Sequence, residues 1–370
     1  MAESIALQAS VPLAPLTTLG VGGLARWFVR ATSVEEAAAA IRWSEDNRVP
    51  LFVLGGGSNL VIADTGFEGL VLQAAFGGLD FRAVGNTTAM RVGAGERWDD
   101  VVAAAVSRGL AGLECLSGIP GAAGGTPIQN VGAYGQDVSR TIAGVTVLDR
   151  TTGTSTVLTG ADCRFGYRTS RFKTEDAGRF LVCDVTFHLA VAPPTLAYPD
   201  VVSEFERRGI ASPAVAEVRD AVLAIRRRKG MVIDPADTDT RSVGSFFMNP
   251  VVDAAHRDRL VAGTDGRVPA YELPDGHVKI PAAWLIEQSG IPRDSRSGGA
   301  GISSKHPLAI VNRGGATAGD VLQLAGRIKR QVADRFGIWL RPEPVFLGFG
   351  DDPDVAFLQE IRKLNVDPTD

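Results

Sequence analysis

The feature that most constrains the fold of this chain is a twenty-residue segment that is rich in glycine and alanine and carries no charge. Residues 116–135 read LSGIPGAAGGTPIQNVGAYG. A solvated linker would contain Ser, Lys or Glu, so we expect this segment to lie inside the protein against something flat or anionic. A dinucleotide meets both descriptions. A buried structural crossover is the weaker interpretation.

A second glycine cluster directly follows a short apolar stretch, Pro50–Leu54, which predicts a strand. The cluster consists of Gly55, Gly56, Gly57, Ser58 and Asn59. Successive glycines let backbone N–H groups point at one anion, and the serine and asparagine add further donors. The loop is suited to a pyrophosphate. Taken alone, it is equally compatible with a tight turn between strands.

One apparent dinucleotide fingerprint fails on its context. Residues 20–25, GVGGLA, fit the pattern G-x-G-x-x-A, but the preceding residues include Pro12 and Pro15 and make a poor strand. We therefore predict no Rossmann unit. Two glycine segments without such a unit favour another way of binding a large dinucleotide such as FAD.

Composition narrows the class of protein. The length of 370 residues predicts two or three domains, and a net charge of -4 offers no basic face for nucleic acid, so we expect a small-molecule partner. No signal peptide and no apolar run long enough to span a bilayer is present, which predicts a cytoplasmic protein without membrane insertion. The spacing of Cys115, Cys163 and Cys183 suggests neither disulfides nor a metal site, and we expect buried, inert thiols.

Helix signals outline the organisation of the chain. A capping box at Ser33–Glu36 predicts a first helix, and further helices are expected at 98–108, 215–228 and 320–336, with strands at 69–73, 90–92, 145–148, 156–158 and 181–189. A change in composition before residue 229 predicts a domain boundary near 215. The expected division is 1–82 and 83–214 as two lobes, 215–350 as an α+β domain, and 351–370 as a docked helix with a tail.

Four polar residues stand among aromatic and apolar neighbours: Tyr167, Arg168, Ser245 and Glu343. Each one alone is more typical of a satisfied polar residue in a core. As a set they can stabilise developing negative charge (Arg168), supply a proton (Ser245) and polarise a carboxylate (Glu343). Patterns for zinc proteases, serine hydrolases and Walker-type nucleotide binding are all missing from the sequence, which disfavours those chemistries.

Seven motifs occur in an order that resembles one known family. They are LGGGSN, GAGERW, LSGIPGAAGGTPIQNVGAYG, CRFGYRTSRFK, GSFFMNP, KIPAAWLIEQSG and RPEPVFLGF, and they extend from about Leu16 to Gly350. The series is similar to the UDP-N-acetylenolpyruvoylglucosamine reductases of bacterial cell-wall synthesis. The resemblance implies an α+β protein: a two-lobed FAD-binding fold of the vanillyl-alcohol-oxidase type, plus a C-terminal substrate-binding domain.

The same resemblance implies non-covalent FAD, NADPH as reductant, and reduction of UDP-N-acetylglucosamine enolpyruvate to UDP-N-acetylmuramate. It implies catalytic roles for Arg168, with the substrate carboxylate, for Ser245, as proton donor, and for Glu343. Substrate contacts fall on Tyr167, on Tyr198 in the tyrosine loop of the longer family type, on Lys229 at the diphosphate, and on Asn249. Besides residues 55–59, the implied FAD contacts are Ser117, Gly118, Ile119, Pro120, Gly121, Gly125, Gln129, Asn130, Gly132, Ala133, Tyr134 and Gly135.

The chain departs from the family pattern at three places. Met248 stands where many relatives have lysine, Arg341 where some have an acid, and the spacing from Lys229 to Asp234 is longer than in some members. Two alternatives to the reductase remain. A flavoprotein oxidase of the same fold often links its flavin to a histidine near the glycine loop, and no histidine precedes residue 188. A non-catalytic nucleotide-binding protein would have no use for the full polar set.

Overall fold

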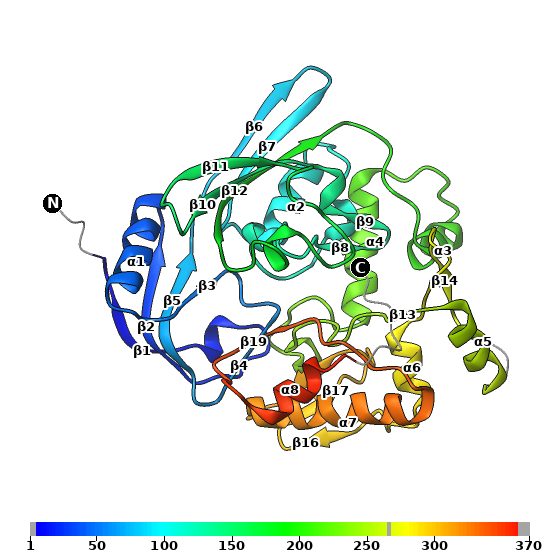
Figure 1. The fold of residues 1–370 in the computed structure, drawn as a ribbon. Coiled ribbons are helices and arrows are strands. Elements are labelled where there is room, and N and C mark those ends of the chain that lie inside the picture. Colours follow the sequence, from blue (N-terminus) through cyan, green and yellow to red (C-terminus); the bar gives the residue numbers. More distant parts are fainter. Residues whose placement is uncertain (1–4, 265–267, 362–370) are drawn as a thin grey trace. The chain divides into compact units, whose positions relative to one another are not determined.

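The computed structural model describes residues 5–264 and 268–361. The chain divides into two compact units, and each is built from three separate segments (Figure 1). The first unit contains the residues up to Val11, Ala25–Gly57 and Glu68–Val232, whereas the second contains Pro12–Leu24, Ser58–Phe67 and the residues from Ile233 onward. The predicted division into four consecutive regions stays a prediction.

A four-stranded sheet begins the first unit. Its order is β1 (Gln8–Pro12), β2 (Leu24–Ala31), β5 (Phe67–Ala74) and β3 (Leu51–Leu54), with β3 parallel to β5. The following helix α1 (Val34–Asp46) buries its small apolar residues in the same core as the sheet. Ser33 caps α1 by accepting the N–H of Glu36, as predicted, but the Glu36 carboxylate accepts from the N–H of Thr32 instead of closing a box on Ser33.

A five-stranded antiparallel sheet completes this core. Its order is β11 (Ser155–Thr159), β10 (Ile142–Asp149), β12 (Phe180–Leu189), β7 (Thr87–Gly93) and β6 (Leu79–Val84). The β6–β7 hairpin projects beyond its neighbours (Figure 1). Helix α2 (Trp98–Val106) packs Trp98, Val101 and Val102 into the core. The helix and four of these strands were expected, whereas β6 was not predicted. Helix α2 ends two residues earlier than the predicted 98–108.

Two further helices close the first unit. Helices α3 (Pro199–Arg208) and α4 (Val215–Arg228) share a small apolar cluster, against which Tyr134 and Tyr198 pack. The bounds of α4 are those predicted from the sequence. Both tyrosines are thus held by packing against a cluster that includes buried Cys115 and apolar residues of α3 and α4.

The second unit is organised around helix α7 (Ala318–Phe336). Its stripe of Val321, Leu324, Ile328 and Val332 is buried as predicted, and Gly337 ends the helix with a φ of 68°. The helix starts two residues before the predicted Asp320, because Thr317 accepts the N–H of Asp320 as the cap. Helix α6 (Ala282–Gln288) and strands β16 (Arg296–Ser297), β17 (Ala300–Ile302) and β18 (Ile310–Asn312) contact α7. The unit also contains β13 (Val251–Val252), β14 (Tyr271–Glu272), β15 (Val278–Lys279) and α5 (Ala254–Ala262).

In the same unit, β19 (Val345–Leu347) pairs in parallel with β4 (Leu60–Ile62), a strand from a distant part of the sequence. No helix in residues 5–264 and 268–361 is both long and apolar enough to cross a membrane.

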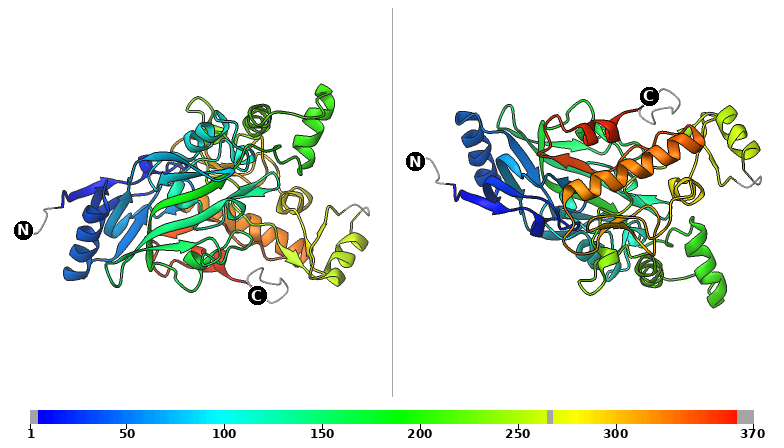
Figure 2. Two further views of the ribbon diagram at one scale, coloured as in Figure 1. Left: turned by 90° about the horizontal axis from the view of Figure 1, so that it is seen from above. Right: turned by 90° about the horizontal axis from the view of Figure 1, so that it is seen from below.

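A buried lysine anchors the last helix, α8 (Pro353–Gln359), which lies beside α7 (Figure 2). The Lys329 Nζ donates to the carbonyls of Phe357 (2.9 Å), Leu358 (2.7 Å) and Glu360 (2.7 Å). These carbonyls are among those that a helix end leaves without partners. Burial lowers the pKa of Lys329 to about 8. The predicted docked helix is confirmed for these residues, and the predicted tail at 362–370 lies outside the described residues.

Lys329 makes stability depend on alkaline pH. Its pKa is about 8 in the folded protein and near the ordinary 10.5 in the unfolded chain, so the unfolded chain binds more protons between these pH values. The contribution of Lys329 to the free energy of unfolding therefore rises from pH 8 to 10.5. Over this range, we expect the free energy of unfolding of wild type to rise by about 2 kcal/mol relative to that of Lys329→Met, as measured by urea titrations. A constant difference would contradict the lowered pKa.

Candidate functional site

The two glycine segments of the first unit touch backbone to backbone. A Cβ added to Gly56 would lie 2.6 Å from the Cα and the carbonyl carbon of Gly121. Real side chains do not approach a backbone this closely, so no residue other than glycine fits at position 56 without a shift of the backbone. Gly121 itself has a φ of 121°, which side chains rarely adopt. The structure therefore brings together the two segments that the sequence predicted for FAD.

Neighbouring backbone holds the long segment in place. Ala123 and Gly124 donate their N–H groups to the carbonyls of Glu96 and Ala94, both at 2.9 Å, and Gly118 donates its N–H to Asp99 Oδ1 at 2.6 Å. Outside the segment there is room. A Cβ on Gly55 or on Gly125 would meet no atom within 4 Å. A fixed glycine-rich backbone with open space at these two positions suits the binding of a large dinucleotide.

The predicted contact residues of this segment all belong to the first unit, but two of them use their side chains internally. The Ser117 hydroxyl is buried and donates to the Glu114 carbonyl at 2.7 Å. The Asn130 amide donates to Gly166 O at 3.0 Å and its oxygen accepts from Ser139 N at 3.1 Å. Contacts of either side chain with FAD stay predictions. In contrast, Ser58 and Asn59 group with the second unit.

Strained backbone marks the place where this segment meets the loop that carries Tyr167 and Arg168. Asn130, Tyr134 and Arg168 have φ values of 45°, 52° and 55°, in the left-handed region that residues other than glycine seldom occupy. The Arg168 Nη2 donates to the Gly132 carbonyl at 2.8 Å. Such strain persists only where surrounding contacts enforce it, and it concentrates at functional sites.

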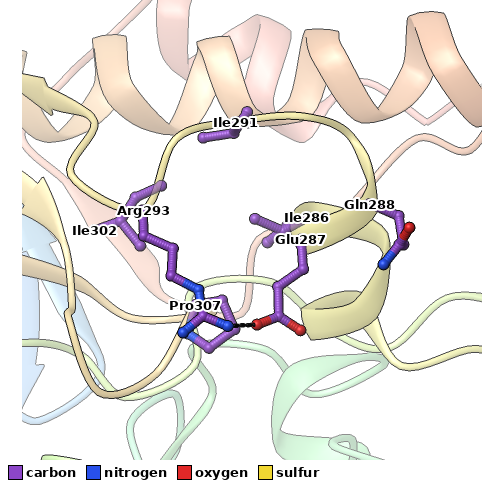
Figure 3. A pocket seen from close by; sticks show the side chains of 7 residues that line it. All are labelled: Ile286, Glu287, Gln288, Ile291, Arg293, Ile302 and Pro307. Atoms are coloured by element: carbon purple, nitrogen blue, oxygen red, sulfur yellow. Dashed lines mark hydrogen bonds and ion pairs between the residues drawn. The ribbon is translucent and has the colours of Figure 1, made fainter.

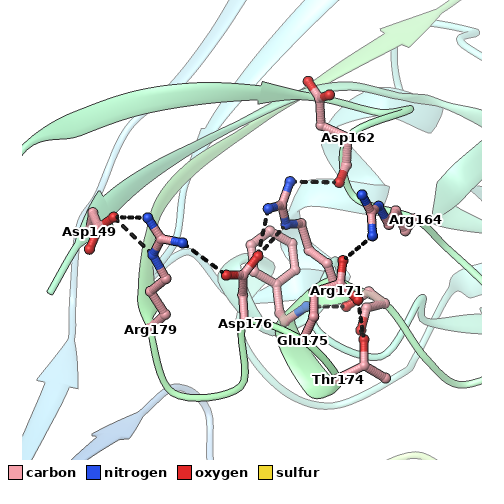
Figure 4. Close-up of polar contacts among 10 residues, drawn as sticks. Asp149, Asp162, Arg164, Arg171, Thr174, Glu175, Asp176 and Arg179 are labelled. Atoms are coloured by element: carbon pink, nitrogen blue, oxygen red, sulfur yellow. Dashed lines mark hydrogen bonds and ion pairs between the residues drawn. The ribbon is translucent and has the colours of Figure 1, made fainter. Parts of the chain in front are cut away.

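An ion-pair network holds the loop that carries Arg168 (Figure 4). Asp149 pairs with Arg179 at 2.7 Å, Arg179 with Asp176 at 3.2 Å, and Asp176 with Arg171 at 2.5 Å. Burial raises the pKa of Asp176, but its bonds with Arg171 and Arg179 outweigh burial and the pKa is lowered. The network therefore favours the ionised carboxylate. The sequence analysis missed it, because the paired residues are separated by up to 30 positions.

Tyr198 and Lys229, predicted for the substrate, lie at α3 and α4 beside Tyr134, which was predicted for FAD. The rings of Tyr134 and Tyr198 meet edge to face with centroids 5.3 Å apart, and the Lys229 Nζ lies 6.0 Å from the Tyr134 ring centroid. Lys229 also pairs with Asp200 at 2.7 Å. Burial would lower the pKa of Lys229, but this bond raises it. Asp200, two residues after Tyr198, was not predicted as part of the site.

In the second unit, the segments that carry Ser245 and Glu343 run side by side. The Glu343 N–H donates to Phe246 O at 2.9 Å, and the N–H of Met248 donates to Arg341 O at the same distance. The amide of Asn59 donates to the Glu343 carbonyl at 3.2 Å. Asn249 accepts from Ala282 N, at the start of α6, at 2.9 Å. The structure thus pairs the segment of Ser245 with the segment of Glu343, although the two are far apart in the sequence. Tyr167 and Arg168 belong to the other unit.

Each unit also contains a pocket. The one in the second unit measures about 270 Å³, and Glu287 and Arg293 form an ion pair at 2.5 Å in its wall (Figure 3). None of the predicted site residues lines it; its lining is Ile286, Glu287, Gln288, Ile291, Arg293, Ile302 and Pro307. The pocket in the first unit, about 300 Å³, includes Lys229 together with Asp200, Ser203, Glu204, Arg207, Ile225 and Arg228.

Burial makes the three cysteines poor nucleophiles, as predicted. It raises the pKa of Cys115 to about 12, that of Cys163 to about 11 and that of Cys183 to about 12.

Comparison with known proteins identifies the family. Residues 234–347 match the C-terminal domain of UDP-N-acetylenolpyruvoylglucosamine reductase, and residues 25–159 match an FAD binding domain. The UDP-N-acetylenolpyruvoylglucosamine reductase of Thermobifida fusca is 50% identical over 351 residues, which cover 92% of this chain and 97% of that protein. The chain belongs to the UDP-N-acetylenolpyruvoylglucosamine reductase family.

Other members of this family agree. The reductase of Streptomyces avermitilis is 47% identical over 349 residues, covering 91% of this chain and 94% of its own. The crystal structure of UDP-N-acetylenolpyruvylglucosamine reductase from Thermus caldophilus has a TM-score of 0.63 at 26% identity, covering 93% and 99% of the two chains. The α+β fold, with its FAD-binding part and C-terminal domain, is confirmed, and the FAD-binding match includes both glycine segments.

The contact between the glycine segments generates a first prediction for this reductase. Gly56→Ala places a methyl group against the backbone of Gly121, so we expect the dissociation constant of FAD to rise at least about tenfold, equivalent to about 1.4 kcal/mol. Gly55→Ala adds the same group in open space and is the matched control, with nearly unchanged affinity. Fluorescence titration of the FAD-depleted protein measures both. Equal affinities for the two variants would contradict the packing argument.

The ion-pair network generates a second prediction. Asp176→Asn removes one partner of two arginines in a mostly buried position, and we expect a loss of about 2–3 kcal/mol in the free energy of unfolding. The control is Glu175→Gln, whose partner Arg164 is exposed; its loss should stay below about 1 kcal/mol. Chemical denaturation distinguishes them, and similar losses for both would rule out a special contribution of Asp176.

Proposed function

We propose that this chain reduces the enolpyruvyl double bond of UDP-N-acetylglucosamine enolpyruvate to give UDP-N-acetylmuramate, with non-covalently bound FAD and with NADPH as reductant. The reaction is a step in peptidoglycan precursor synthesis and takes place in the cytoplasm. The observation that carries the proposal is identity of 50% to a reductase of this name along nearly the whole length of both chains. The joined glycine segments supply the surface that the cofactor requires.

The proposed mechanism assigns each chemical task to a named side chain. FAD, when bound, supplies the hydride that reaches the β-carbon of the double bond. Negative charge then develops at the α-carbon and spreads into the substrate carboxylate. Arg168 stabilises this charge by its guanidinium, and Glu343 assists as the second catalytic group. The bond from Arg168 to Gly132 O and the strained loop orient the guanidinium before substrate arrives.

Ser245 completes the reaction by donating its hydroxyl proton to the α-carbon. A serine hydroxyl is a very weak acid, but the carbanionic intermediate is strongly basic, so a positioned hydroxyl suffices where water is excluded. Its position follows from the buried rings of Phe246 and Phe247, which anchor the segment with centroids 5.1 Å apart.

Substrate recognition is assigned to Tyr167, Tyr198, Lys229 and Asn249. The contacts of Tyr198 and Lys229 with the Tyr134 ring support this assignment for these two residues. Met248, half-buried, carries no charge where many relatives have lysine. The proposed domain roles are FAD binding for residues 1–82 and 83–214, with the tyrosine loop in the latter, and substrate binding for 215–350.

The overall reaction can be tested in one anaerobic cuvette. The visible flavin band of the purified protein should bleach on addition of NADPH and return on addition of UDP-N-acetylglucosamine enolpyruvate. A colourless protein that takes up no FAD would overturn the proposal. Rapid return of the band in air without substrate would favour an oxidase.

The proton-donor role predicts a split between the half-reactions. Ser245→Ala should leave flavin reduction by NADPH nearly unchanged and slow flavin reoxidation by substrate about 10²–10⁴-fold, the usual contribution of a general acid. Stopped-flow absorbance measures both steps. Ser212→Ala, at an exposed serine, is the control with normal rates. Equal slowing of both half-reactions by Ser245→Ala would show that Ser245 is not the proton donor.

A further inference from the structure

Arg226, in the last turn of α4, is a buried cation that the mechanism above does not use. Only 9% of the surface of Arg226 is exposed. The Nη2 atom donates to Gly118 O at 3.3 Å and to Met231 O at 2.8 Å, and the guanidinium also interacts electrostatically with the Tyr134 side chain. The acceptors of its hydrogen bonds are thus two neutral carbonyls.

This guanidinium lacks a carboxylate. Among the described residues, no acidic oxygen lies within 4.0 Å of Arg226, and its buried Nε donates to no acceptor. Asp99 is the acid that interacts with it at longer range. Both oxygens of Asp99 are already engaged by Arg219, at 2.6 and 2.9 Å, and one of them also accepts from Gly118 N.

The surroundings of Arg226 add positive charge. Lys229, one helical turn further, faces the same Tyr134 ring, and the charge of Arg168 also acts on Arg226. Burial and the charge of Arg168 lower the pKa of Arg226, while Tyr134 and Asp99 raise it; an arginine nevertheless stays charged at neutral pH. A buried, incompletely paired cation is unfavourable in the protein alone and becomes favourable when an anion compensates it.

The neighbours of Arg226 indicate where that anion comes from. Gly118 and Tyr134 both belong to the glycine-rich segment, and a Cβ on Gly118 would lie 3.4 Å from the unpartnered Nε. We propose that Arg226 is a binding residue for an anionic oxygen, of a phosphate or a carboxylate, on a ligand held at the glycine-rich segment and Tyr134. The inference rests on the proposed function, which supplies two such ligands: FAD, with its diphosphate, and the substrate, with its diphosphate and carboxylate.

The test compares Arg226→Met with Arg227→Met, which removes a neighbouring exposed arginine from the same helix. FAD affinity is measured by fluorescence titration of the FAD-depleted full chain. Affinity for UDP and for UDP-N-acetylglucosamine enolpyruvate is measured by flavin difference spectra at saturating FAD. The Tm without ligand is recorded for each protein. For Arg226→Met we expect the Tm to equal or exceed that of wild type, because an incompletely paired buried charge has been removed.

We further expect the dissociation constant of one ligand to rise about 10–100-fold in Arg226→Met, with the values of Arg227→Met unchanged. A rise for FAD assigns the anion to the cofactor; a rise for UDP assigns it to the substrate diphosphate; a rise for the enolpyruvyl substrate alone assigns it to the carboxylate. Arg226→Lys, which keeps the charge but not the fork of donors, should recover part of the lost affinity.

A purely structural role would give the opposite pattern. A lower Tm for Arg226→Met, with unchanged affinity for all three ligands, would overturn the inference while leaving the proposed function intact. Wild-type protein that bound neither FAD nor UDP would overturn the proposed function and this inference together.

Discussion

The contact between Gly56 and Gly121 is the constraint on which the rest of the first unit depends. It joins the loop after β3 to the segment between α2 and β10, and it leaves no room for even one methyl group. Glycine at such positions costs conformational entropy on folding, so it is kept where close backbone approach is required. Here the approach places the peptide groups of two glycine-rich segments side by side, an arrangement that side chains at Gly56 or Gly121 would prevent.

The loop of Arg168 in the first unit shows the reverse strategy, in which backbone strain is imposed on a residue other than glycine. Arg168 takes a left-handed backbone although it is not glycine, and the Asp176 network keeps its loop from relaxing. The Arg168 guanidinium donates to the Gly132 carbonyl, and this bond ties the strained loop to the glycine-rich segment. Backbone strain and a mostly buried ion pair are therefore two parts of one arrangement.

Local signals in the sequence predicted α1, α2, α4, α7 and α8 but not α3, α5 or α6. The cap at Ser33, the stripe on α7 and the bounds of α4 follow from residues close together in the chain, and sequence patterns of this kind reflect local physics. The family motifs supplied the candidate residues. The sequence did not reveal their partners: Asp200 beside Lys229, or Arg226 beside Gly118. These contacts depend on packing between distant segments, and a basic run such as residues 226–229 does not show which arginine is buried.

The alternation of the chain between its two units has a consequence for synthesis on the ribosome. Strand β4 leaves the ribosome early, yet its partner β19 lies about 285 residues later in the sequence. The hydrogen bonds of Asn59 with Glu343 and Val345 likewise form only after those late residues have been made. The second unit therefore cannot close until translation is almost complete, and residues 58–67 stay without their native pairing while the first unit forms. A nascent chain stalled between residues 67 and 345 would lack the partner of this apolar strand, and its unpaired edge would stay open to pairing with other chains for most of translation.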